Sequence, residues 1–438
     1  MKEFDSAMIH EKTERNAAPG VEQTELNPPP TAIEATAHPI HNELPVRQII
    51  DANDRVLLLQ GPVGPFFLQF AAWLRPRVTA VWKINFNGGD WYYYRGDDAV
   101  DYLGGVEAWP EFLRDFMRRR QISKIFLFGD CRIYHRLAVE VCRSLNVPAM
   151  IFEEGYIRPD SITLEEGGVN AYSSLPRDPA FYWGLPDLPE PALKPALMQF
   201  RRVAWEASVY YCIGFLMSWR YRRYEHHKNF NPVRKGWRWV LAGMRKLMYR
   251  SKDRELTQYL TTQCSRRYFL VPLQVRTDSQ VMVHSHYPDI RAFIGEVMQS
   301  FARHAPQDKL LVFKHHPIDR GFEHYGSFIR KLAKAHGIQD RVIYAHELHL
   351  PSCLNHACGV VVINSTVGLS SLLHHTPVKT LGHAIYDMEG LTCQRPLDEF
   401  WQDPGTVSEE LHRKFRRYLL EKTQLNGSFY GRFPFADD

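Results

Sequence analysis

The apolar run Leu310-Leu311-Val312-Phe313 is followed directly by Lys314-His315-His316-Pro317. A short apolar run that ends beside a proline is typical of a buried strand. Side chains just beyond such a strand lie at the edge of an open α/β sheet, where ligands bind. Lys314 and His316 can together donate several hydrogen bonds to one anion, so the stretch predicts a phosphate site. A lone histidine in this position is more often part of a solvated polar strand end.

Two other stretches repeat this pattern. Glu153 and Glu154 follow the apolar run 149–152, and Asn364-Ser365-Thr366 follows the run 359–363. A helix is expected after Thr366, and the free N–H groups of a helix N-terminus attract an anion. Since the carboxyl ends of parallel strands meet at one edge of a sheet, we expect the three stretches to meet in one crevice. Their agreement favours a ligand site at His316.

Short apolar runs alternate with helical patterns in two parts of the chain. The strand-like runs are residues 56–60, 78–84, 125–128, 149–152, 269–273, 310–313, 342–344 and 359–363. This alternation predicts parallel sheets with right-handed crossovers. We therefore expect an α/β protein with two Rossmann-like domains, paired as in the glycosyltransferase-B fold with a substrate cleft between them.

The predicted organisation has five parts. They are a disordered N-terminal tail (1–52), a first Rossmann-like domain (53–185), a linker with a basic, aromatic, amphipathic helical insertion (186–265), a second Rossmann-like domain (266–395) and a C-terminal helix and tail (396–438). The tail has no apolar period that could bury a face, which is why we predict disorder there.

The composition is that of an ordinary enzyme except for the aromatic residues, at 13%. The seven cysteines are scattered without a CxxC pair. This spacing argues against a disulfide framework or a structural zinc site and fits a reducing compartment. Residues 1–20 lack an apolar core, so no signal peptide is predicted. We expect the protein to remain in the cytoplasm.

Positive charge is concentrated in residues 201–256, which hold 14 Lys and Arg against 4 Asp and Glu, together with eleven aromatic residues. The apolar run 209–219 is too short for a bilayer span, which takes roughly 20 residues. We expect helices that lie on an anionic membrane surface, with aromatic rings at the headgroups and basic side chains on phosphates. The residues expected at this surface are Trp219, Arg220, Arg222, Arg223, Trp237 and Trp239.

The basic segment has two other interpretations. It could be a helical insertion packed on the body of the protein. It could also bind nucleic acid through basic and aromatic side chains. We expect no nucleic-acid partner, because the rest of the chain shows no nucleic-acid-binding module.

The strand ends form a set suited to phosphate chemistry. Ser365, Thr366 and the helix N-terminus can hold a phosphate, while Lys314 and His316 balance its charge. Such a clamp would stabilise a phosphate leaving group. It therefore suits transfer of a group from a phosphate-activated donor.

Carboxylates at the same edge supply acid–base chemistry. Neighbouring carboxylates can differ in pKa, so one of Glu153 and Glu154 can stay ionised while the other acts as an acid. Asp278, beyond the strand 269–273, adds a third carboxylate. Carboxylates that act on a sugar carbon and on an acceptor hydroxyl, beside a phosphate clamp, indicate glycosyl transfer from a phosphate-activated sugar.

Several longer motifs carry a family resemblance. They are Gln60-Gly61-Pro62, Asn85-Phe86-Asn87-Gly88-Gly89-Asp90, Phe128-Gly129-Asp130-Cys131-Arg132 and Phe152-Glu153-Glu154-Gly155-Tyr156-Ile157-Arg158-Pro159. Over roughly residues 55–395 the chain resembles the KpsS/LipB capsule proteins of Gram-negative bacteria, a family similar to the retaining β-Kdo transferases that use CMP-Kdo. The resemblance implies transfer of Kdo to phosphatidylglycerol or its lyso form, which starts the capsule linker. It also implies a peripheral place on the inner membrane, among other capsule synthesis and export proteins.

The resemblance assigns roles to individual residues. The first domain is expected to bind the acceptor and the second the CMP-sugar. Glu154 would be the acid/base, with Glu153 beside it, and His316, Ser365 and Thr366 would hold CMP. Asp278 is the expected nucleophile, with Asp130 also available. The other residues expected to bind substrate are Gly61, Asn87, Asp130, Arg132, Arg158, Gln274, Lys314 and Asn364.

Two rival functions remain open at this level. The first is a non-catalytic capsule export or modification subunit that binds a lipid-linked chain. The second is a nucleotide-sugar epimerase, which has no use for a basic aromatic insertion because its substrates are soluble. We expect no cofactor and no metal requirement, since no DxD-type pair follows a strand.

Overall fold

The computed structural model describes residues 49–197, 200–225, 232–276 and 279–436. Most of the tail predicted for residues 1–52 and the predicted nucleophile Asp278 therefore lie outside the described residues. Ile49, within the range predicted for the tail, is buried in a hydrophobic core. Ordered packing thus begins before residue 53.

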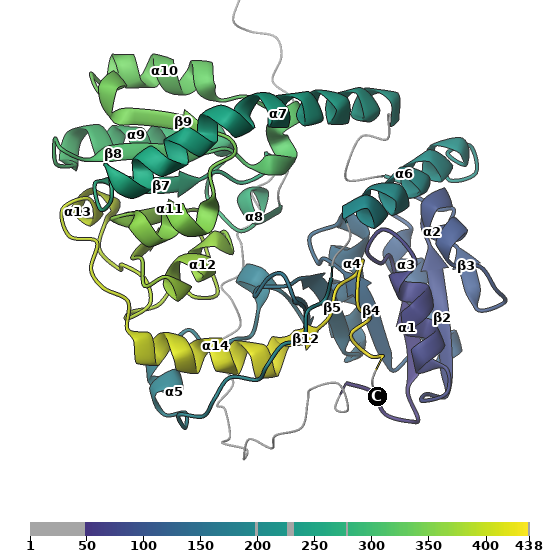
Figure 1. Ribbon diagram of the computed structural model, residues 1–438. Coiled ribbons are helices and arrows are strands. Elements are labelled where there is room, and N and C mark those ends of the chain that lie inside the picture. Colours follow the sequence, from purple (N-terminus) through teal and green to yellow (C-terminus); the bar gives the residue numbers. More distant parts are fainter. Residues whose placement is uncertain (1–48, 198–199, 226–231, 277–278, 437–438) are drawn as a thin grey trace, which may run out of the picture. The chain divides into compact units, whose positions relative to one another are not determined.

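Seven strands form the first sheet. They are β1 (Arg55–Leu58), β2 (Ala80–Asn85), β3 (Ala99–Asp101), β4 (Lys124–Phe128), β5 (Ala149–Glu154), β6 (Ser161–Glu166) and β12 (Gln424–Asn426). Their order is β12-β6-β5-β4-β1-β2-β3 (Figure 1). The five strands from β3 to β5 are parallel, and β6 and β12 are antiparallel to their neighbours. The parallel part has the strand order of a Rossmann fold.

Five parallel strands form the second sheet. They are β7 (Tyr268–Pro272), β8 (Leu310–Lys314), β9 (Val342–Ala345), β10 (Gly359–Val362) and β11 (Val378–Thr380). Their order, β11-β10-β7-β8-β9, again places the first strand in the middle. The predicted α/β class with two Rossmann-like sheets is therefore confirmed.

Alternating apolar side chains bury both faces of each sheet. In β1, Val56 and Leu58 belong to one core, whereas Leu57 contributes to the core on the other face. In β10, Val361 likewise faces away from Val360 and Val362. Strands that are apolar on both faces are typical of a parallel sheet covered by helices on both sides.

The helices connect these strands. In the first part of the chain they are α1 (Phe66–Leu74), α2 (Gly88–Tyr93), α3 (Trp109–Arg120), α4 (Ile133–Leu145), η2 (Asn170–Tyr172), α5 (Pro179–Trp183) and α6 (Phe200–Leu216). In the second part they are α7 (Pro232–Thr262), α8 (Ser279–Met282), α9 (Ile290–His304), η3 (Pro317–Gly321), α10 (Gly326–Ala335), η4 (Gln339–Arg341), α11 (Leu350–His356), α12 (Val367–Leu373), α13 (Leu397–Phe400) and α14 (Glu409–Thr423). Among the described residues, each helix is too short or too polar to cross a membrane.

The basic aromatic segment forms two helices, α6 and α7, and α6 packs on α2. Two glycines of α2 make this contact possible, because a Cβ on Gly88 would lie 2.6 Å from Met217 and one on Gly89 would lie 2.6 Å from the Tyr210 ring. The stretch Asn87-Gly88-Gly89-Asp90, of which Asn87 was predicted to bind substrate, is therefore a docking site for α6.

A buried hydrogen-bond network fixes the α2–α6 contact. The Tyr210 hydroxyl accepts from Asn87 Nδ2 at 2.8 Å and donates to Asp90 Oδ1 at 2.9 Å. Gln60 Nε2 donates to Asp90 Oδ2 at 3.0 Å. Asn87 also accepts from the N–H groups of Gly89 and Asp90, so its side chain caps α2. Buried polar groups are costly unless they are paired in this way.

Helix α7 packs against segments that follow two strands of the second sheet, β8 and β9. Asp253 on α7 is buried, and its carboxylate accepts from the N–H groups of His346 and Glu347 at 2.8 and 2.6 Å. Arg245 donates to the carbonyl of Arg320 in η3 at 2.7 Å. One face of α7 is thus attached to the protein, as the packed-insertion interpretation requires.

The C-terminal segment returns to the first sheet. After α14, strand β12 pairs with β6, and the Phe429 ring lies 4.9 Å from Phe66. The Phe435 ring lies 5.0 Å from Phe70. The segment predicted as a helix and tail therefore supplies an edge strand and core side chains to the other end of the chain.

Replacing Tyr210 with Phe should lower the free energy of unfolding by about 1–3 kcal/mol, because Asn87 and Asp90 lose a buried partner while the ring remains. Chemical denaturation measures this loss. Tyr92→Phe is the matched control, since Tyr92 lies on α2 and is 39% exposed. It should change the free energy by no more than about 0.5 kcal/mol. Equal losses in the two variants would contradict the role of the Tyr210 hydroxyl.

Candidate active site

Each sheet has one place where the chain reverses its direction of winding. In the first sheet this switch point lies between β1 and β4, and in the second between β7 and β10. Ligands of open α/β sheets bind beyond the strand ends at this point. Gln60 and Asp130 follow β1 and β4, while Gln274 and Asn364 follow β7 and β10. The strand exits selected from the sequence therefore include both switch points.

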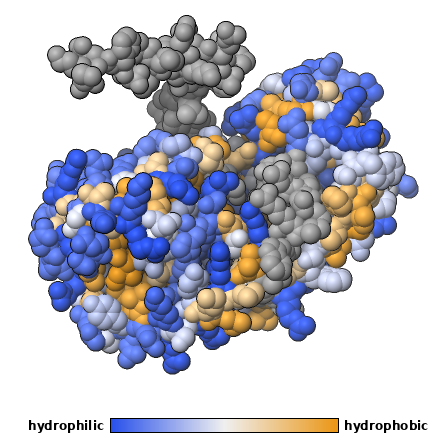
Figure 2. All heavy atoms as spheres, turned by 90° about the horizontal axis from the view of Figure 1, so that it is seen from above, coloured by the Kyte–Doolittle hydropathy of each residue, from blue (hydrophilic) through white to orange (hydrophobic). Residues whose placement is uncertain are grey.

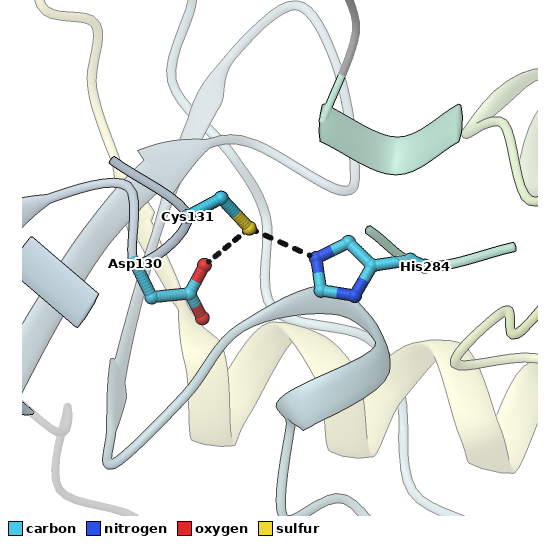
Figure 3. A group of neighbouring side chains, drawn as sticks. All are labelled: Asp130, Cys131 and His284. Carbon is cyan, nitrogen blue, oxygen red and sulfur yellow. Dashed lines mark hydrogen bonds between the residues drawn. The ribbon is translucent and has the colours of Figure 1, made fainter. Parts of the chain in front are cut away.

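Side chains from both sheets meet at Cys131. Its sulfur lies 3.2 Å from Asp130 Oδ1 and 3.2 Å from His284 Nε2 (Figure 3). Cys131 follows β4, whereas His284 follows α8 in the second half of the chain. Neither Cys131 nor His284 is among the site residues predicted from the sequence. Cys131 stands within a quoted motif, but nothing in the local pattern around His284 indicates this contact.

Asp130 is held rigidly at the first switch point. Its side chain is 7% exposed, and Oδ2 accepts from the N–H of Val169 at 3.0 Å. Arg132 donates to Gln60 Oε1 at 2.8 Å and lies over the Phe128 ring. A buried carboxylate with fixed partners keeps one orientation, as a reacting group requires.

Glu153 lies at the end of β5 beside the exit of β4, where a Cβ on Gly129 would be 3.4 Å from its carboxylate. Burial, together with the negative charges of Glu154 and Asp130, raises the pKa of Glu153 to about 7. Glu154 is exposed, although its N–H donates to Glu153 Oε1 at 3.0 Å. The geometry therefore favours Glu153 over Glu154 as the group that exchanges a proton near neutral pH.

Two residues predicted to bind substrate also hold the segment around His284 in place. Gln274 Nε2 donates to Asn364 Oδ1 at 3.1 Å, and Asn364 Nδ2 donates to the carbonyl of His284 at 3.1 Å. The N–H of His383 donates to the same carbonyl at 3.1 Å. Burial lowers the pKa of His284, so its ring is neutral and can accept a hydrogen bond from the Cys131 thiol.

The surroundings of the predicted phosphate clamp change the ionisation of its basic residues. Burial lowers the pKa of His316 to about 4, and the nearby Lys314, Arg158 and Arg320 lower it further. His316 is therefore neutral at pH 7 in the protein without phosphate, and the charge-balancing role predicted for it is a property of the phosphate-bound state. Its Nδ1 accepts from the N–H of Ile318 at 3.2 Å. Burial also lowers the pKa of Lys314, the other basic residue of the predicted clamp. Arg158 lies near enough to His316 to add positive charge beside the clamp.

The other clamp residues lie at the beginning of α12. Ser365 Oγ accepts from the N–H of Val367 at 3.2 Å, so one of the free N–H groups at this helix end is already bonded. Thr366 is half-buried and makes no capping hydrogen bond through its side chain. The carbonyl of Ser365 accepts from the Tyr386 hydroxyl at 2.5 Å, which fixes the turn.

Three predicted substrate residues make other contacts. Asn87 caps α2 and bonds to Tyr210. Gly61 is packed against Phe67, because a Cβ there would lie 2.8 Å from that ring. Arg158 is exposed and donates to the carbonyl of Gly155 at 3.0 Å. Asp278 lies outside the described residues.

Comparison with known proteins gives the family. The model of the capsule polysaccharide biosynthesis protein family matches residues 123–430. The chain belongs to this family. The capsule polysaccharide export protein KpsS of Escherichia coli is 45% identical over 389 residues, which cover 87% of this chain and 98% of that protein. The capsule polysaccharide modification protein LipB of Neisseria meningitidis serogroup B is 40% identical over 399 residues, covering 90% and 95%. The predicted KpsS/LipB family is therefore confirmed, and with it a role in making or exporting capsule polysaccharide.

Two solved structures resemble the family member described here more distantly. Thermosulfurimonas dismutans KpsC, named as a β-Kdo 2,7 transferase, is 15% identical with a TM-score of 0.38, covering 83% of this chain and 88% of that one. UDP-GlcNAc 2-epimerase from Neisseria meningitidis is 10% identical with a TM-score of 0.27, covering 87% and 96%. Neither likeness is close enough to assign a reaction.

Glu153→Gln should change how stability depends on pH. The folded pKa of about 7 lies above the ordinary value of 4.5. The stability contributed by the protonated group is therefore complete below about pH 4.5 and lost as pH rises through about 7. At pH 8 the variant should be more stable than the native protein by on the order of 1–3 kcal/mol, and the gain should vanish near pH 4.5. Denaturation at several pH values measures this.

Glu154→Gln is the control for this prediction, because Glu154 is the exposed neighbour on the same strand. Its pH profile should follow that of the native protein. Parallel profiles for Glu153→Gln and the native protein would mean that Glu153 is ionised at neutral pH.

Proposed function

We propose that this protein is a retaining β-Kdo glycosyltransferase that moves Kdo from CMP-Kdo to phosphatidylglycerol or its lyso form and so starts the capsule linker. The observation that carries the proposal is the pair of neighbouring carboxyl groups, Asp130 and Glu153, at the first switch point. Charge repulsion between them contributes to the raised pKa of Glu153. One rigid carboxylate beside one that exchanges protons near pH 7 is what a double displacement needs.

We place the nucleophile at Asp130. Its carboxylate would attack the anomeric carbon of Kdo, while CMP leaves with the electron pair of the broken bond. Glu153 would then take the proton of the acceptor hydroxyl as that oxygen displaces Asp130. Asp278, which the resemblance favoured, remains the other candidate; it follows β7 and lies outside the described residues.

The CMP phosphate would bind at the second switch point. Lys314 and Arg158 supply positive charge, and the Thr366 hydroxyl and His316 ring supply hydrogen bonds. Asn364 and Gln274 act by holding the His284 loop beside the site. Since these cations balance the leaving phosphate, transfer is expected to need no added metal.

The Glu153→Gln variant should transfer Kdo about 10²- to 10⁴-fold more slowly than the native protein, because general acid–base catalysis is lost. His316→Ala should transfer Kdo roughly 10-fold more slowly, because the variant loses one neutral hydrogen bond to the donor. Glu154→Gln is the control and should remain active within a few-fold. Incubation with CMP-Kdo and a fluorescent phosphatidylglycerol, read by mass, measures all three.

A trapped intermediate identifies the nucleophile. Native protein quenched during turnover should carry the mass of one Kdo on the peptide that contains Asp130. An adduct on Asp278 would move the nucleophile but keep the double displacement. Absence of transfer and of CMP release in the native protein would refute the enzyme and favour a binding subunit.

That binding subunit is the second candidate function. The curated relatives are named as an export protein and a modification protein, and neither name states a transfer reaction. A subunit of this kind would bind the lipid-linked chain without releasing CMP. It would have no need of Glu153, a carboxyl group with a raised pKa, beside the carboxylate of Asp130.

We further propose that α6 and α7 hold the protein on the cytoplasmic face of the inner membrane, near other capsule synthesis and export proteins. Hydrophobic patches interrupt the hydrophilic surface of the molecule (Figure 2). On and just after α6, Trp205 and Trp219 are 69% and 68% exposed. On α7, Leu247 and Met248 are 73% and 71% exposed. Large apolar side chains with this exposure suit a lipid surface.

Basic side chains surround these apolar residues. The exposed ones include Arg201, Arg222, Arg223, Lys246, Arg250, Lys252 and Arg254. Arg220, also expected at the membrane, is paired with Asp101 at 2.8 Å. The side chains of Trp237 and Trp239 lie outside the described part of the structure. The exposed cations would attract anionic lipid, while the other faces of both helices pack on the protein.

A charge variant tests this proposal. Replacing Arg222, Arg223, Lys246 and Arg250 with Gln should weaken binding to phosphatidylglycerol vesicles roughly 10²- to 10³-fold, since each contact contributes about 1 kcal/mol. Vesicle sedimentation at several salt concentrations measures this. The control makes the same charge change at four exposed residues elsewhere, namely Arg118, Lys331, Lys334 and Lys422. Equal weakening in both variants would show only a general charge effect.

A further inference from the structure

Three potential metal ligands converge where the two halves of the chain meet. The Asp130 carboxylate, the Cys131 sulfur and the His284 ring each offer one donor atom, and these atoms all lie within 4.8 Å of one another. Figure 3 shows the sulfur between the carboxylate and the imidazole, with Nε2 of the ring pointing at it. Among the described residues this is the one group of its kind.

The distances suit a small cation. In a tetrahedral zinc site, bonds of about 2.3 Å to sulfur and 2.1 Å to nitrogen place the two donor atoms about 3.6 Å apart. The sulfur here lies 3.2 Å from both neighbours. Admitting the ion would take a widening of a few tenths of an ångström at the sulfur, with the carboxylate oxygen and the imidazole nitrogen, which lie within 4.8 Å of each other, on two sides of the ion. The fourth position would stay open.

Hydrogen bonds to neighbouring groups also orient the segments that carry these donors, as is usual for metal ligands. Asp130 Oδ2 accepts from the N–H of Val169 at 3.0 Å, which leaves Oδ1 directed at the sulfur. The His284 backbone is fixed by Asn364 and His383, and its side chain is only 1% exposed.

We propose that Asp130, Cys131 and His284 form a binding site for a soft divalent cation, Zn²⁺ foremost. Thiolate and imidazole donors select zinc over Mg²⁺ and Ca²⁺, which prefer oxygen ligands. Binding forms a Zn–S bond and releases the thiol proton, so one proton leaves for each ion bound. The ion joins the exit of β4 to the segment after α8.

This site has a consequence that rests on the proposed function. A cation that binds Asp130 Oδ1 would remove that carboxylate from attack on Kdo. Zinc would then be an inhibitor of the transferase rather than its cofactor. This agrees with a transfer reaction that needs no metal.

Metal titration of the full chain tests the site. Calorimetry with ZnCl₂ in two buffers of different ionisation enthalpy should give one ion bound and one proton released. CoCl₂ should produce a near-ultraviolet charge-transfer band from thiolate to cobalt, and MgCl₂ should give no signal. Absence of the cobalt band in the native protein would overturn the proposal without any variant.

Variants locate the ligands. Cys131→Ser and His284→Gln should each weaken zinc binding at least about 100-fold, more than the loss of an outer-shell partner typically causes. Cys212→Ser is the matched control, because its thiol is exposed on α6 and could bind metal by chance. Equal zinc affinity in the native protein and in both site variants would refute the site.

Activity is a separate measurement. If the protein transfers Kdo, zinc at the concentration that fills the site should abolish transfer, and Mg²⁺ at that concentration should not. Full activity of the zinc-loaded protein would overturn the inhibition. If no Kdo is transferred at all, the proposed function fails while the zinc and cobalt titrations still decide the site.

Discussion

Parallel pairing of β1 with β4 is the constraint on which the first half of the structure depends. The register sets Leu57 opposite Ile125 and Leu58 opposite Phe126, all four fully buried. Because parallel strands end at the same edge, this register brings Gln60 and Asp130 together there, and β5 adds Glu153 beside them. Burial of apolar side chains thus creates the low-dielectric place in which the pKa of a carboxyl group is raised. The same burial therefore stabilises the sheet and raises the pKa of Glu153.

The polar residues around the site are of two kinds: carboxyl groups that could react, and amides that hold neighbouring segments in place. Gln274 and Asn364 use their side-chain amides on each other and on the His284 carbonyl. The side chain of Asn87 caps α2 and donates a hydrogen bond to the Tyr210 hydroxyl. A buried amide must be paired, so an Asn or Gln at a strand exit is available to hold a neighbouring loop as readily as a ligand. Asp130 and Glu153 lie on the same edge, and their carboxylates accept hydrogen bonds from nearby groups that hold them at the site.

The sequence predicted the α/β class, the family and most strand exits, because these depend on local apolar runs and long motifs. It could not predict that Gly88 and Gly89 accept α6, since that depends on a helix more than a hundred residues later. The contact between Cys131 and His284 could not be predicted for the same kind of reason, because the two residues lie in different halves of the chain. Nor could the sequence predict that burial and three nearby cations lower the pKa of His316 in the protein without phosphate. Local pattern gives residue type and element, whereas side-chain ionisation is set by tertiary neighbours.

The return of the C-terminus has a consequence for synthesis on the ribosome. The core of the first sheet contains Phe66 and Phe70 from early in the chain and Phe429 and Phe435 from its end. Strand β12 covers the edge of β6. Until those last residues emerge, the nascent chain exposes an unpaired strand edge and an unfilled aromatic core, features that attract chaperones and promote aggregation. The first sheet to be translated is therefore the last to be completed.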